Sequence, residues 1–142
     1  MRFASTRNPS VQADFREAVL TGLAPDGGLY HPIEQPDLHS LFLGLNPEAP
    51  FVETAVEVIE RLFGDSFGAD TESVVRRAFP FSPRLVALSD QIDILELFHG
   101  PSCAFKDFGA SFLAAAMETF LADTEDRVVI LTATSGDTGS AV

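Results

Sequence analysis

The sequence IDILELF occupies residues 92–98, and a shorter apolar run, VVIL, occupies residues 128–131. The first run alternates and then becomes mostly apolar, which is typical of a strand. The second is rich in β-branched residues, which is typical of a strand buried on both faces. Between them, apolar residues recur at helical spacing from Phe108 to Phe120. Strand, helix and strand in this order predict a parallel crossover unit, so the expected fold class is α/β.

The region before this unit has a different character. Apolar residues repeat at helical spacing over residues 11–19 and 51–62, and glycine follows each repeat at Gly22 and Gly64 as a stop signal. A shorter helix over residues 70–78 would follow, capped by Asp70. The N-terminal region is therefore expected to be mainly helical.

Proline and glycine mark the connections. Residues 25–28 read PDGG, which predicts a tight turn. Residues 31–50 contain four prolines and predict a wrapping loop with one or two helical turns over residues 37–43. Residues 85–88 are strand-like, so we expect a helical region over residues 1–83 and an α/β domain over residues 84–142. One crossover unit exposes both faces of its strands, so we expect the chain to be the N-terminal part of a longer polypeptide, truncated at Val142.

Composition excludes several classes of function. Nine basic and 21 acidic side chains give a net charge of -12, which would repel a phosphate backbone and disfavours nucleic-acid binding. The same charge can simply keep a globular protein soluble. A lone cysteine with three scattered histidines predicts neither an internal disulfide nor a metal site. The sequence contains no signal peptide and no apolar run of about 20 residues, so we expect a cytoplasmic protein with no membrane partner.

Lys106 is the first candidate for chemistry because every other cation in the chain is an arginine. It lies between Phe105 and Phe108, where a strand gives way to a helix. Desolvation by aromatic rings and the positive end of a helix both disfavour the ammonium, so we expect the pKa of Lys106 to be lowered. Such an amine can form a Schiff base. The alternative is a solvated lysine paired with Asp107 or Glu96.

The second candidate is the segment TSGDTGS at residues 134–140, which follows the buried strand and should open a helix. Free backbone N–H groups, two glycines and several hydroxyls there would suit a carboxylate or a phosphate. The alternative is a simple helix cap by Ser135 or Asp137. Since Asp137 is itself negative, it should face something other than the bound anion.

Residues 98–109, FHGPSCAFKDFG, and residues 132–139, TATSGDTG, together resemble threonine synthase, a pyridoxal phosphate (PLP) enzyme of the tryptophan-synthase-β-like fold, fold type II. STR at residues 5–7 and GLAPDGGLYHP at residues 22–32 extend the resemblance over nearly the whole chain. The resemblance implies that Lys106 is the catalytic, cofactor-bearing lysine. The other cofactor-binding residues that it implies are Phe105, Ser135, Asp137 and Thr138, and the substrate-binding residues are Ser135, Gly136, Thr138 and Gly139.

The same resemblance implies a reaction, in which O-phosphohomoserine and water become threonine and phosphate. Lys106 would both hold the cofactor and move protons. Asp137 stands where many relatives of this fold carry Asn, and the Asp form resembles threonine synthase in particular. The loop for the cofactor phosphate, the partner of the pyridine nitrogen and most basic residues for the substrate phosphate are expected beyond Val142. The isolated 142 residues are therefore expected to be inactive.

Two other functions remain open on the sequence. A threonine-synthase-like phospho-lyase would eliminate phosphate without forming threonine, and a non-catalytic binding or assembly module could retain an ancestral site. His99, at the end of a predicted strand, is expected to be a hydrogen-bonded structural residue rather than a catalyst. Cys103 is expected to be a small buried side chain. The oligomeric state does not follow from the sequence.

Overall fold

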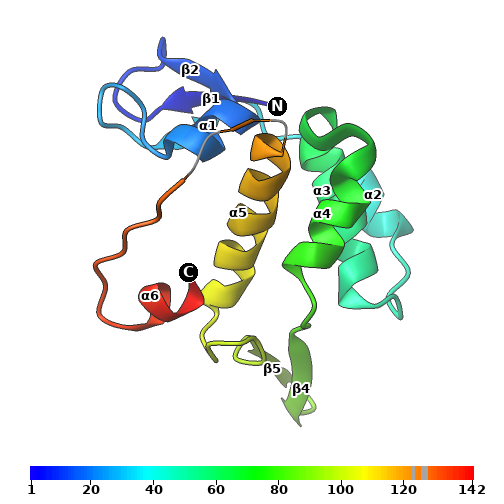
Figure 1. Ribbon diagram of the computed structural model, residues 1–142. Helices are drawn as coiled ribbons and strands as arrows, with labels where there is room; N and C mark the ends of the chain where they lie inside the picture. Colours follow the sequence, from blue (N-terminus) through cyan, green and yellow to red (C-terminus); the bar gives the residue numbers. More distant parts are fainter. Residues whose placement is uncertain (123, 126–127) are drawn as a thin grey trace. The chain divides into compact units, whose positions relative to one another are not determined.

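The computed structural model describes residues 1–122, 124–125 and 128–142 of the chain (Figure 1). The chain divides into two compact units, Met1–Ser73 and Val74–Val142. The division falls within helix α4 (Thr71–Ala78). The domain boundary expected after residue 83 stays a prediction.

The first unit contains a three-stranded antiparallel sheet that the sequence pattern did not indicate. Strand β1 (Arg2–Ser5) lies between β2 (Gln12–Asp14) and β3 (Tyr30–Pro32) (Figure 1). Phe3 pairs with Ala13 on one side and with Pro32 on the other. Strands of three or four residues are too short to show a clear alternation of apolar and polar residues.

Helix α1 (Phe15–Thr21) begins later than the predicted start at residue 11, because Gln12–Asp14 pairs with β1 instead. The side chain of Asp14 accepts a hydrogen bond from Glu17 N at 2.8 Å and so caps the helix. Gly22 ends the helix as predicted, with φ of 71° and its N–H bonded to Ala18 O at 3.0 Å.

Two further helices follow in the first unit. Helix α2 (His39–Gly44) confirms the short helical segment within the proline-rich loop. Helix α3 (Phe51–Phe67) begins where predicted but continues through Gly64, and Gly68, with φ of 56°, ends it. A glycine inside a helix costs only about 1 kcal/mol, which the length of this apolar helix can offset.

Aromatic rings make the core of the first unit. The ring of Phe15 on α1 stacks on Phe63 of α3 with centroids 4.0 Å apart, and it meets Phe67 edge-on at 5.7 Å. Phe3 of the sheet lies 6.0 Å from Phe15. Such aromatic pairs contribute about 0.5–1.5 kcal/mol beyond their buried area. Phe15 therefore joins the sheet to helix α3.

In the second unit, β4 (Arg84–Ser89) and β5 (Ile92–Glu96) confirm the two predicted strands but form an antiparallel hairpin. Leu85 faces Leu95 across the ladder. The parallel crossover expected here is not formed by the described residues. The physical reason is local: β5 finds its partner across the tight connection to β4, whereas a parallel partner must be reached through a long crossover.

Helix α5 (Lys106–Leu121) confirms the predicted helix. One of its faces carries aromatic rings that pack on residues just after α4. The ring of Phe108 meets Phe81 edge-on at 5.0 Å, and Phe112 stacks on Phe79 at 6.2 Å. These contacts fix the first turns of α5 within the second unit.

The prediction of a strand over residues 128–131 is wrong, since these residues lie in no strand. Their exposed fractions run from 48% at Val128 to 90% at Leu131. A strand exists only where a neighbour satisfies its backbone groups, and no described strand pairs with this segment. The short helix α6 (Asp137–Ala141) follows, as the composition of the turn predicted.

Candidate functional site

Lys106 is the first residue of α5, so the predicted helix start is confirmed. Its Nζ lies 4.7 Å from the ring centroid of Phe105, in a cation–π arrangement. Lys106 is half-buried, but the Phe105 ring is 60% exposed. The desolvated aromatic surround that the sequence predicts for the amine is therefore not formed by the residues described. Phe108 packs on Phe81 instead.

Neither of the two carboxylates considered as partners of Lys106 is paired with it in the described part of the chain. Glu96 Oε2 lies 2.7 Å from His99 Nε2. The carboxylate of Asp107 accepts hydrogen bonds from Ser102. The interpretation of Lys106 as one half of a surface ion pair with these residues therefore has no support in the structure.

The expectations for His99 and Cys103, two residues of the loop before Lys106, have different outcomes. His99 is hydrogen-bonded to Glu96, as expected of a structural histidine. The prediction that Cys103 is buried is wrong, because its side chain is exposed. Cys103 has a left-handed φ of 59° in a turn in which its N–H bonds to Gly100 O at 3.1 Å. The turn places this residue at the surface.

Asp107 is a buried carboxylate that the sequence reasoning did not single out. Its exposed fraction is 2%. It accepts from Ser102 N at 2.9 Å and from Ser102 Oγ at 2.5 Å. A Cβ at Gly100 would overlap with this carboxylate. The sequence signal for this role is Gly100, seven residues before an aspartate that directly follows the lysine. An aspartate beside a lysine also fits an ion pair, so the signal is weak.

The turn before α6 is organised by a threonine hydroxyl. Thr134 Oγ1 accepts from Gly136 N at 3.1 Å and from Gly139 N at 3.0 Å. Gly136 has φ of 143°, a conformation that favours glycine. Two N–H groups expected to be free for an anion are thus bonded within the turn. The N-cap residue of α6 is Gly136, which has no side chain, so capping by Ser135 or Asp137 is not observed.

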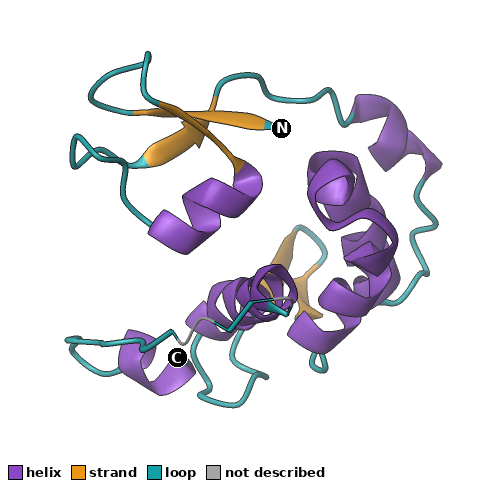
Figure 2. Cartoon of the chain, turned by 45° about the horizontal axis from the view of Figure 1, so that its top comes forward, coloured by secondary structure: helices purple, strands orange, loops and turns teal. Residues whose placement is uncertain are grey.

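The second unit brings the two predicted motifs together at one end of α5. Helix α6 packs on α5, and it lies beside the N-terminal turns of α5 in both views (Figures 1 and 2). Lys106 starts α5, and the turn with Ser135 and Gly136 leads directly into α6. Asp137, Thr138 and Gly139 belong to α6 itself. An amine and a group of hydroxyls are therefore presented by adjacent helix starts.

The first unit contains a second ordered turn, at the other segment used for the resemblance. Ser5 Oγ donates to Asp26 Oδ1 and Oδ2 at 2.7 and 2.9 Å, and Gly28 N donates to Asp26 Oδ1 at 2.9 Å. Arg7 Nη1 donates to Asp26 O at 3.0 Å. The Ser5 hydroxyl, followed by the Gly28 N–H, lowers the pKa of Asp26 from its ordinary value of 3.8. The predicted tight turn over residues 25–28 is confirmed.

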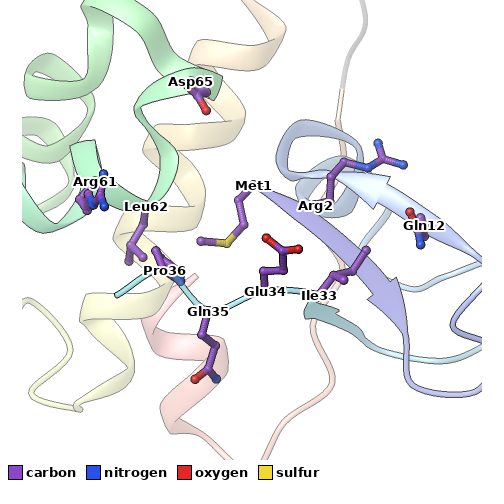
Figure 3. A pocket seen from close by; sticks show the side chains of 10 residues that line it. All are labelled: Met1, Arg2, Gln12, Ile33, Glu34, Gln35, Pro36, Arg61, Leu62 and Asp65. Atoms are coloured by element: carbon purple, nitrogen blue, oxygen red, sulfur yellow. The ribbon is translucent and has the colours of Figure 1, made fainter. Parts of the chain in front are cut away.

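A pocket of about 560 Å³ lies in the first unit. Figure 3 shows its wall formed by the strand ends, the segment after β3 and helix α3. Arg2 and Arg61 contribute positive charge, while Glu34 and Asp65 contribute negative charge. None of the predicted site residues lines it. The mixed lining favours no single class of charged ligand.

Two classes of site find no support within the described ranges. Over residues 1–122, 124–125 and 128–142, no three His, Cys, Asp or Glu side chains gather in a way that could hold a metal ion. In the same ranges no helix has both the length and the apolar character needed to cross a membrane.

The family model described as "Threonine synthase N terminus" matches residues 2–79 of this chain, more than half of its length. The chain belongs to the threonine synthase family. Threonine synthase from Haemophilus influenzae is 40% identical over all of this chain and 33% of its own length, and that from Escherichia coli K12 is 35% identical over the same shares. The chain thus spans about a third of the length of the curated threonine synthases it matches.

Solved threonine synthases share its α/β fold. The crystal structure of the E. coli threonine synthase superposes with a TM-score of 0.88 at 34% identity, over 99% of this chain and 33% of that one. A PLP-bound threonine synthase from Brucella melitensis gives the same TM-score at 40% identity, over 99% of this chain and 32% of that one. At this identity, the likeness covers both the sequence and the fold of the described segment.

Proposed function

We propose that this protein is a threonine synthase, which converts O-phospho-L-homoserine and water to L-threonine and phosphate with PLP held on Lys106. The observation that carries the proposal is the position of the chain's sole lysine at the first residue of α5, beside the hydroxyl-rich turn that leads into α6. Membership of the threonine synthase family and the PLP-bound Brucella relative support it.

The residues present fit part of a PLP site. Lys106 offers a half-buried primary amine that can bond covalently to an aldehyde carbon. Phe105 offers an exposed ring face next to that amine. Ser135, Asp137 and Thr138 would contact the cofactor from the turn before α6 and the start of α6. When bound, PLP supplies an electron sink for the substrate carbons.

The chain's own residues would bind the substrate and move protons. Lys106 Nζ, once free of the cofactor, would take a proton from one substrate carbon and return it to another. Ser135 and Thr138 would donate hydroxyl hydrogen bonds to the substrate. Gly136 and Gly139 would contribute the shape of the turn, because their N–H groups donate to Thr134 Oγ1.

The remaining parts of the proposal concern groups outside these residues. We place in the rest of the polypeptide the loop for the cofactor phosphate, the partner of the pyridine nitrogen, further basic residues and the parallel sheet of fold type II. The chain's coverage of a third of its relatives supports this. Residues 1–142 alone are then expected to show no turnover. We also propose a cytoplasmic enzyme without nucleic-acid or membrane partners.

Product analysis tests the proposed reaction. The protein as its source makes it is incubated with O-phosphohomoserine, and threonine, phosphate and elimination products are quantified. Equal amounts of threonine and phosphate are expected. Phosphate with an unsaturated or keto product and no threonine would favour the phospho-lyase, and no reaction at all would favour a non-catalytic module.

Two variants assign the chemistry to the amine. Lys106→Ala is expected to lose both bound PLP absorbance and turnover. Lys106→Arg keeps the positive charge near Phe105 but has no amine that can bond to the cofactor, so it is expected to fail in the same way. Full activity in Lys106→Arg would contradict the role given to Lys106.

A further inference from the structure

We propose that Asp107 is a positioning residue for Lys106. Its buried carboxylate holds residues 100–105 against the first turn of α5 and so fixes the backbone position from which the Lys106 side chain extends. The inference rests on the proposed function, because it assigns the orientation of the same amine. Asp107 itself touches neither cofactor nor substrate in this role.

The hydrogen bonds of Asp107 hold Ser102 in place. Ser102 donates to it twice, from its backbone N–H at 2.9 Å and from its hydroxyl at 2.5 Å. Both oxygens of the carboxylate are used, Oδ2 by the N–H and Oδ1 by the hydroxyl. A carboxylate that accepts two hydrogen bonds from one residue fixes both the position and the direction of that residue.

Asp107 is buried at the start of α5. Asp107 is 2% exposed, although the preceding Lys106 is half-buried and Phe105, two residues before it, is exposed. A buried charge is stable only where hydrogen bonds satisfy it, and the N-terminal turn of a 16-residue helix favours a negative charge at that point. The surroundings of Asp107 therefore suit a carboxylate at this position.

The loop before α5 passes close to Asp107. A Cβ at Gly100 would overlap with the Asp107 carboxylate, so the backbone passes directly against it. Cys103 N donates to Gly100 O at 3.1 Å, and Asp107 N donates to Ala104 O at 3.1 Å. A backbone hydrogen bond thus closes a turn at each end of the loop, and the hydrogen bonds from Ser102 to Asp107 join the loop to the helix.

Lys106 lies between these fixed points. Its backbone is held on one side by the loop and on the other by Asp107, and its Nζ lies 4.7 Å from the ring centroid of Phe105. A displacement of a reacting group by about 1 Å can cost about 100-fold in rate. Loss of the Asp107 hydrogen bonds should therefore lower kcat by a larger factor than it raises the KM for O-phosphohomoserine.

The test compares variants in the full protein loaded with PLP. Asp107→Asn keeps the size of the side chain but replaces one acceptor oxygen by an amide NH2, so it can no longer accept both hydrogen bonds from Ser102. Ser102→Ala removes the hydroxyl only and leaves Asp107 in its place. Ser102→Thr restores a hydroxyl, and Asp90→Asn, at the exposed turn of the β4–β5 hairpin, is the matched charge-loss control.

The expected results are graded. The kcat of Asp107→Asn should fall about 10- to 100-fold with little change in the KM for O-phosphohomoserine. Ser102→Ala should lose about 3- to 10-fold, and Ser102→Thr should recover most of it. The visible circular dichroism of the PLP bound to Asp107→Asn should also change, because it reports the orientation of the cofactor on Lys106. Asp90→Asn should match the wild type in every measurement.

Two results would overturn the inference. If the Asp107→Asn and Ser102→Ala proteins are less stable but their folded fractions keep the wild-type kcat and circular dichroism, Asp107 has a purely structural role and the proposed function stands. If the wild-type protein carries no PLP on Lys106, the proposed function and the inference fail together.

Discussion

Each unit contains a small cluster of a serine, an aspartate and a glycine. The serine hydroxyl donates to the aspartate, and the glycine has no room for a Cβ. In the first unit these residues are Ser5, Asp26 and Gly28, and a Cβ at Gly28 would overlap with Ser5 Oγ. In the second they are Ser102, Asp107 and Gly100. In both, a backbone N–H also donates to the carboxylate at 2.9 Å.

The two clusters differ in what they connect. Ser5 and Asp26 are 21 residues apart, so their bond joins the end of β1 to a distant turn. Ser102 and Asp107 are five residues apart, and their bond orders one loop before Lys106. The same hydrogen-bonded arrangement thus supports the fold in one place and, on our account, the reactive amine in the other. Disrupting the first should change stability, and disrupting the second should change chemistry.

The largest expected effect is that of Gly100→Ala. The added Cβ must displace the Asp107 carboxylate, so kcat with O-phosphohomoserine should fall by about 100-fold or more. Steady-state kinetics on folded, PLP-loaded protein measures this. Gly44→Ala is the control, because nothing lies within 4 Å of a Cβ at Gly44. An unchanged kcat in Gly100→Ala would remove the distinction between the two clusters.

Next in size is Gly28→Ala in the first cluster. The overlap with Ser5 Oγ should destabilise the protein by about 1–3 kcal/mol, as overpacking usually does. The midpoint of urea unfolding measures the loss, and Gly44→Ala again serves as the control. The kcat of the folded variant should equal that of the wild type, and a fall in kcat at unchanged stability would reverse the roles given to the two clusters.

A smaller effect is expected from Thr134→Val, which removes the oxygen that accepts from Gly136 N and Gly139 N. Both N–H groups are exposed, so water can replace the lost acceptor and stability should change by less than about 1 kcal/mol. The turn should lose its fixed shape, and the KM for O-phosphohomoserine should rise several-fold. Thr134→Ser keeps the hydroxyl and should keep the wild-type KM. An unchanged KM in Thr134→Val would show that this hydroxyl does not order the substrate site.

The smallest effect is a pH dependence at Asp26. Because hydrogen bonds lower its pKa in the folded chain, its ionised form stabilises the fold above the ordinary pKa of 3.8, and this contribution is lost as the pH falls below that value. The stability difference between wild type and Asp26→Asn should therefore be constant above pH 3.8 and should shrink below it. Urea unfolding over this range measures the difference.

Ser5→Ala checks the cause of that dependence, because the Ser5 hydroxyl is its largest source. This variant should lose part of the same pH dependence while keeping the Asp26 carboxylate. Stability curves for wild type and Asp26→Asn that stay parallel through the acid range would contradict the lowered pKa.

Long periodic elements were predictable from the sequence, whereas the shortest strands and the pairing of strands were not. Helices α3 and α5 carry enough turns for a 3.6-residue repeat to show. Strands β1, β2 and β3 have only three or four residues each, and their pairing depends on contacts between distant segments. The apolar run over residues 128–131 has the composition of a buried strand, but composition cannot supply the neighbouring strand that it needs.

The candidate site was predictable in its residue types but not in its hydrogen bonds. Lys106 and the hydroxyl-rich turn stand out in the sequence because of their spacing and composition. Asp107 does not, because an aspartate beside a lysine indicates an ion pair, and Thr134 stands out only as one of several hydroxyls in that turn. Their roles depend on Gly100, Ser102 and the backbone conformation, which sequence patterns do not determine.

Borohydride reduction shows whether Lys106 carries PLP. The protein as its source makes it is reduced, digested and mapped by mass spectrometry, with attention to the peptide that contains Phe105, Lys106 and Asp107. We predict a pyridoxyl adduct on Lys106. A protein that binds PLP but leaves Lys106 unmodified after reduction would contradict the account.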